Sequence, residues 1–63
     1  MKKSLGYAFL VGSNCIVEIF DHGFDDQKWE YIYGLHYGPG AYIEISHHDF
    51  LVKVNEKSIL VLA

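Results

Sequence analysis

The sequence contains no arginine, and its five basic residues are all lysines. Arginine is the side chain that proteins favour for contacts with phosphates and base edges. The lysines are scattered along a chain of net charge −3, so no general basic surface for nucleic acid is expected. The eight acidic residues are also too few for the dense acidic surface of a DNA mimic.

The sequence has a single cysteine and no long apolar run, and both facts bear on the cellular compartment in which the protein is expected. Small secreted domains usually carry an even set of cysteines, whereas Cys15 has no partner within the chain. We therefore expect a reducing, cytoplasmic location, with Cys15 as a buried structural thiol. The apolar run at residues 7–11 is too short for a signal peptide, and no run reaches the 18 apolar residues of a membrane span.

What the sequence does contain is typical of a folded domain, since 51% of its residues are hydrophobic and 16% are aromatic. Short apolar segments separated by Gly, Asn, Asp and Pro predict one all-β domain over residues 1–63. The predicted strands cover residues 7–11, 15–20, 28–37, 41–46, 51–54 and 58–63. Strands this short and this numerous predict a small five- or six-stranded antiparallel barrel.

Turn signals connect these strands. Gly38-Pro39-Gly40 predicts a tight hairpin turn, which we take to account for the nearby Gly34 as well. Ser46, followed three residues later by Asp49, predicts a single capped helical turn over residues 47–50. The last strand is apolar on both faces, which predicts burial by barrel closure or by a subunit contact.

The order of these elements resembles the Src-homology-3-like small barrel. The resemblance covers residues 15–54: a strand, an acidic loop at residues 21–27, a long strand, a tight hairpin, a helical turn and a short last strand. It implies the barrel architecture, which unrelated binding modules share, and no particular ligand. The usual tyrosine-rich loop motif is not reproduced at Phe20-Asp21-His22, and the final strand is additional.

No group of residues has the spacing of a known catalytic or metal-binding motif. The histidines are interpreted as surface or turn residues, because none of their spacings is that of a zinc site; they are His22, His36, His47 and His48. Cys15 lies in no nucleophile motif, and the acidic loop lacks the calcium-binding pattern. We therefore expect no enzymatic activity, no cofactor and no metal.

Aromatic side chains are more numerous than so small a core requires. On the strand at residues 28–37, Trp29, Tyr31, Tyr33 and Leu35 alternate onto one face, which is either the core or a binding surface. Tyrosine and tryptophan are enriched at protein interfaces, and three carboxylates lie in the neighbouring loop. The predicted partner contacts are Trp29, Tyr31, Tyr33, Tyr42, Asp21, Asp25 and Asp26.

These observations favour a non-enzymatic protein-interaction module. In size and character the chain is similar to phage-encoded or bacterial accessory proteins, including anti-defence inhibitors of the anti-CRISPR type. That analogy implies a small inhibitor or adaptor that binds a host protein. One alternative is a nucleic-acid-binding small barrel that uses Lys28, Lys53 and Lys57 beside Trp29, and another is a histidine-based metal-binding protein. A homo-oligomer formed through the segment from Ser58 to Ala63 is compatible with all three.

Overall fold

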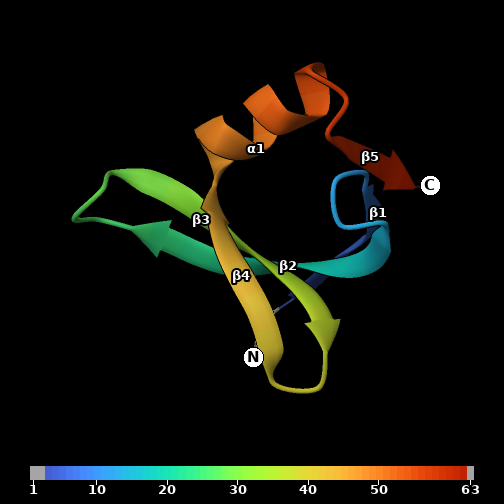
Figure 1. Cartoon of the computed structure of the whole chain (residues 1–63). Coiled ribbons are helices and arrows are strands. Elements are labelled where there is room, and N and C mark those ends of the chain that lie inside the picture. Colours follow the sequence, from blue (N-terminus) through green and yellow to red (C-terminus); the bar gives the residue numbers. More distant parts are fainter. Residues whose placement is uncertain (1–2, 63) are drawn as a thin grey trace.

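The computed structural model describes residues 3–62, which form one antiparallel sheet and a short helix (Figure 1). The elements in chain order are β1 (Lys3–Leu10), β2 (Cys15–Asp25), β3 (Glu30–Gly38), β4 (Ala41–Ser46), α1 (His47–Asn55) and β5 (Ile59–Leu62). The strand order in the sheet is β4-β3-β2-β1-β5, so the last strand returns to pair with the first.

The prediction of an antiparallel β fold with a short helix is confirmed, but closure into a barrel is not. β4 and β5 are the two edges of the described sheet. Helix α1 contacts β3 and both edge strands, β4 and β5, and it therefore lies across one face of the sheet. Within residues 3–62 no helix is long and apolar enough to cross a membrane.

The core lies between α1 and one face of the sheet. Its buried side chains are Ala8, Val17, Ile19, Leu35 and Ile59, and the partly buried side chains that flank them are Leu10, Cys15, Tyr33, Ile45, Phe50 and Val54. Valine and isoleucine alternate with other residues along β2, so one face of that strand is apolar, as its period of two predicts. Cys15, expected to be buried, is only half-buried at the margin of this core.

Helix α1 is longer than the predicted single turn and replaces the strand predicted over residues 51–54. Its N-terminus is capped as predicted, because the backbone N–H of Asp49 donates to Oγ of Ser46 at 3.2 Å. Phe50 and Val54 lie one turn apart and pack against the core. Valine is a poor helix former, so tertiary packing rather than intrinsic propensity determines the length of α1.

Strand β2 continues through most of the segment predicted as an acidic loop. A β-bulge lies between its pairs Asp21–Tyr33 and Phe24–Tyr31, and Gly23 within the bulge has a φ of 89°. An extra residue on one strand reverses the faces on which the following side chains lie. Phe24 and Tyr31 consequently share a face of the hairpin, which the sequence pattern did not predict.

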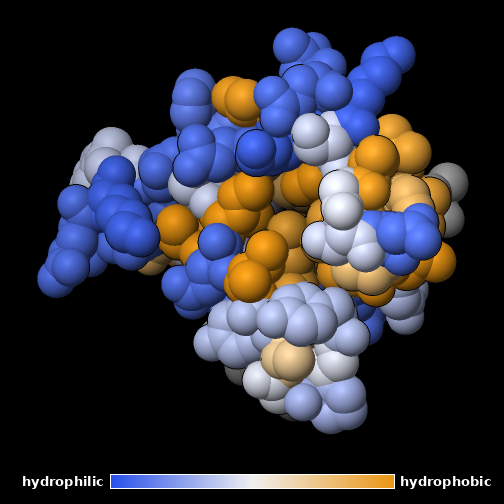
Figure 2. Space-filling view, in the orientation of Figure 1, coloured by the Kyte–Doolittle hydropathy of each residue, from blue (hydrophilic) through white to orange (hydrophobic). Residues whose placement is uncertain are grey.

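Strand β5 is an exposed edge. Ile59 is buried, but Leu60, Val61 and Leu62 are exposed, so among the described residues the sheet does not bury this strand on both faces. Burial by a subunit contact stays a prediction. Ala63 lies outside the described residues. Figure 2 shows hydrophobic residues in the middle of one face, below α1, and also on the side of the molecule that carries β5.

Candidate functional site

The tip of the β2–β3 hairpin projects from the rest of the fold, away from α1 and β5 (Figure 1). Asp25 closes the turn at this tip, because its Oδ1 accepts hydrogen bonds from the backbone N–H groups of Gln27 (2.9 Å) and Lys28 (3.1 Å). Trp29 follows with a φ of 57°, in the left-handed region that non-glycine residues rarely adopt. The turn therefore fixes the position and direction of the backbone at Trp29, just before β3 begins.

Three aromatic side chains meet on this projecting hairpin, and we call them the hairpin aromatic cluster: Phe24, Trp29 and Tyr31. The ring of Phe24 lies 5.2 Å from the Trp29 ring and 5.1 Å from the Tyr31 ring, both edge to face. Edge-to-face contacts are a favourable geometry for aromatic pairs. The cluster is nevertheless open to solvent, since Trp29 is 77% exposed and Tyr31 is 56% exposed.

The position of α1 explains why these rings are exposed while the next aromatic residue is not. Tyr33 lies on the same face as Tyr31, but its hydroxyl is 2.6 Å from Nδ1 of His47, and its ring is 5.3 Å from that of Phe50. Because α1 begins at His47, its cover reaches Tyr33 and does not extend over the hairpin aromatic cluster. The predicted contact Tyr33 is therefore half-buried and separate from the exposed rings.

The other predicted contact residues lie in different settings. Oδ1 of Asp21 accepts a hydrogen bond from the backbone N–H of Gly23 at 2.8 Å and stabilises the bulge. Asp25 stabilises the turn, whereas Asp26 is exposed in it. Tyr42 lies on β4, outside the hairpin. The structure thus brings Trp29 and Tyr31 together with Phe24, and it places the two hydrogen-bonded carboxylates in backbone-stabilising roles.

A second group of side chains occupies the opposite face of the sheet, where β2, β3 and β4 adjoin. We call it the histidine cluster: His22, His36, Tyr42 and Glu44. The Nε2 atoms of His22 and His36 are 3.2 Å apart, and Nδ1 of His22 is 3.5 Å from Oε2 of Glu44. The Tyr42 ring stacks on His36, with 4.7 Å between centroids and 12° between planes.

Gly34 makes room for this cluster. A Cβ atom at position 34 would overlap the His22 imidazole, whose side chain is only 4% exposed. The interpretation of His22 as a surface histidine is therefore wrong, and Gly34 belongs to β3 and not to the hairpin turn. A glycine inside a strand often marks such a close approach, and this was the one sequence signal for the cluster.

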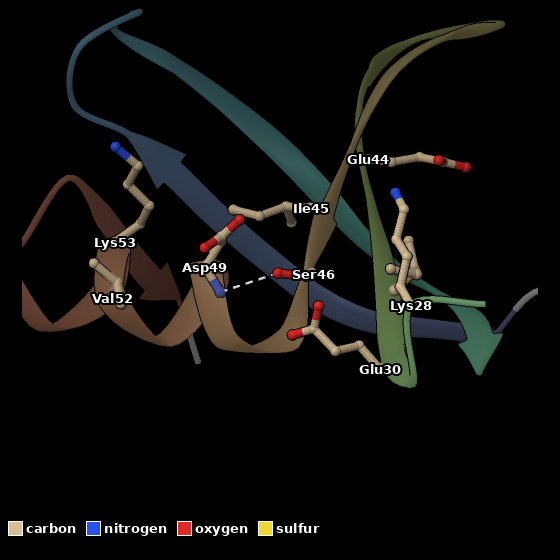
Figure 3. A pocket seen from close by; sticks show the side chains of 9 residues that line it. Lys28, Glu30, Glu44, Ile45, Ser46, Asp49, Val52 and Lys53 are labelled. Carbon is tan, nitrogen blue, oxygen red and sulfur yellow. Dashed lines mark hydrogen bonds between the residues drawn. The ribbon is translucent and has the colours of Figure 1, made fainter. Parts of the chain in front are cut away.

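Two of the three lysines suggested for a nucleic-acid path line one hollow between β3, β4 and α1, at opposite ends of it (Figure 3). Lys28 and Lys53 line this hollow of about 590 Å³. Glu30, Glu44 and Asp49 line it too, so carboxylates outnumber lysines there. Nζ of Lys53 also lies 3.4 Å from Oε1 of Glu56, a further carboxylate that is not among the residues lining the hollow. The hollow is thus a mixed-charge surface and not a basic one.

A scan against protein-family models finds no match for this chain, and searches of the curated proteins and of the solved structures find no match either. Among residues 3–62, no three or more His, Cys, Asp or Glu side chains gather in a way that could hold a metal ion. The candidate sites on the described surface are the exposed aromatic rings, the pair of histidines and the mixed-charge hollow.

Proposed function

We propose that the protein is a non-enzymatic interaction module that binds another protein through the hairpin aromatic cluster. The observation that carries this proposal is the exposure of Trp29 and Tyr31 at the projecting tip of the hairpin. Tryptophan and tyrosine are the residues most enriched among those that dominate binding energy. Their contacts with Phe24 order the rings before binding, which lowers the entropy lost on association.

The same features indicate the chemistry of the partner. A projecting cluster of rings fits an apolar pocket or groove, and the exposed Asp26 and Lys28 beside it suit a polar rim. The size and composition of the chain support a role as a small cytoplasmic inhibitor or adaptor that binds a host protein. The element order supports an Src-homology-3-like architecture, with β5, and not residues 51–54, as its short last strand.

Alanine at Trp29 or at Tyr31 is expected to weaken partner binding by at least about 2 kcal/mol, roughly 30-fold in Kd. The partner is first identified by mass spectrometry of a nuclease-treated pull-down, and its affinity for each variant is then measured with purified proteins. Tyr37→Ala is the matched control, because Tyr37 is 54% exposed on the same strand but at its other end. Equal losses for Tyr37→Ala and Tyr31→Ala would contradict the assignment of the site.

The same experiment addresses the nucleic-acid alternative. If the retained material is nucleic acid, or is lost on nuclease treatment, that alternative replaces the proposal. Binding through lysines would also weaken steeply as the salt concentration rises. The carboxylates that surround Lys28 and Lys53 support the protein-binding proposal instead.

The edge strand β5 supports a further proposal, that two copies of the chain associate through it. Unpaired backbone groups and exposed apolar side chains on an edge strand favour pairing with another strand. Val61, 57% exposed, lies in this strand. We expect light scattering to give a dimer mass for the wild type and a monomer mass for Val61→Lys, with both folded by circular dichroism. A monomeric wild type would refute the proposal.

A further inference from the structure

We infer that the histidine cluster is a half-site for a divalent transition-metal ion such as Zn²⁺, with Nε2 of His22 and Nε2 of His36 as the two ligands. Imidazole nitrogen is among the commonest ligands of such ions. Neither histidine has a role in the proposed protein contact, because the cluster lies on the opposite face of the sheet from the exposed rings. The inference is therefore independent of the proposed function.

The separation of the two nitrogens fits a shared metal. Zn–N bonds are about 2.0–2.1 Å long, and the two Nε2 atoms are 3.2 Å apart. An ion placed one Zn–N bond length from each nitrogen would have an N–Zn–N angle of about 100–106°. This is close to the tetrahedral angle that Zn²⁺ prefers. The ring centroids are 5.4 Å apart, so the two rings meet nearly end to end, and each would tilt to aim its Nε2 lone pair at a shared ion.

Glu44 lies beside the second ring nitrogen of His22, the one that would not bind the metal. Its Oε2 is 3.5 Å from Nδ1 of His22, on the side of the ring away from His36. Ligating histidines usually face a carboxylate or carbonyl through their second nitrogen, which keeps the proton there and leaves the ligating nitrogen free. Glu44 thus favours the His22 tautomer that presents a lone pair at Nε2.

The surroundings hold both rings in position. Phe20 lies 4.5 Å from the His36 ring on a tilted plane, and Tyr42 stacks on the same ring. His22 is buried over Gly34. Without metal, the two Nε2 atoms are within hydrogen-bond distance of each other. A metal ion bound by both nitrogens would replace this direct contact.

The site supplies two ligands and not four. No third His, Cys, Asp or Glu completes a metal-binding group within the part of the chain that the structure describes. The remaining positions on the ion would be filled by water or by a donor atom from a second molecule. Binding would consequently be weaker than at a structural zinc site with four protein ligands.

The test adds ZnCl₂ to the untagged full-length protein and follows the histidine ring signals by NMR, with affinity from calorimetry. We expect the His22 and His36 signals to shift together in a saturable way. His36→Gln should weaken binding at least tenfold, and Glu44→Gln about tenfold. His48→Gln should leave the affinity unchanged, because His48 is an exposed residue of α1 outside the cluster.

Two results would overturn the inference. One is the absence of saturation at Zn²⁺ concentrations up to about 1 mM. The other is an equal loss of affinity for His48→Gln and His36→Gln, which would assign the ion to surface histidines. The NMR measurement on the wild type requires no substitution, so it decides the question even if the variant at the half-buried His36 fails to fold.

Discussion

Leu35→Ala is expected to lower the free energy of unfolding by about 2–5 kcal/mol. Leu35 is 1% exposed in the middle of β3, where it packs in one cluster with Val17 and Ile19. Alanine would lose the transfer free energy of the removed atoms and leave a cavity that neighbouring strands cannot fill. Since 63 residues at about 0.05–0.15 kcal/mol each imply a total stability of roughly 3–9 kcal/mol, the variant would lose much of it.

Urea unfolding followed by circular dichroism measures this loss. Ile43→Ala is the matched control, because Ile43 is the direct cross-strand neighbour of Leu35 on β4 and yet is exposed. Its truncation should cost well under half as much, since exposed positions usually change stability by about 0.5 kcal/mol or less. Equal losses at the two positions would show that the core does not lie where the structure places it.

Gly34→Ala is expected to destabilise the fold by about 1–3 kcal/mol, although it adds only one methyl group. The backbone of Gly34 is not among the left-handed glycines, so the effect is steric and not conformational. The new Cβ would overlap the His22 ring, which is buried and has to move. The same urea titration measures the change, and NMR of the His22 and His36 ring signals would report the disruption of the cluster.

A double-mutant cycle isolates this steric effect. In a His22→Ala background the ring is absent, so Gly34→Ala should cost much less than in the wild type. Gly12→Ala is the control for added methyl groups, because a Cβ there meets nothing within 4 Å and its φ is likewise not left-handed. If Gly34→Ala costs the same with and without the His22 ring, the close approach of the two residues is disproved.

Several local elements of this protein follow from its sequence. The strand at residues 41–46 has the bounds of β4, because alternation and a flanking turn signal define both ends. Ser46 caps α1 because its hydroxyl can satisfy a free N–H at the first turn. Tyr33 and Leu35 share one face of the long strand, as its period of two predicts, and the burial of Leu35 assigns to the core a face that the alternation had left open.

The tertiary structure decided what covers those faces. Tyr31 and Tyr33 share a face, but the beginning of α1 covers only Tyr33, and a periodic pattern does not specify where another element ends. Helix α1 itself extends past its predicted turn because Phe50 and Val54 pack on the core, a gain that exists only after the sheet has formed.

The sequence did not predict the histidine cluster, for a related reason. The pairing of three strands brings together His22, His36 and Glu44, which are far apart in the chain. His22 lies on the same face as Phe20, as alternation along β2 predicts, but the residues of β3 and β4 that adjoin it depend on the register between the strands. The sequence determined most of the strands, the hairpin turn and the helix cap from local chemistry, whereas contacts across strands depend on a register that only the folded sheet fixes.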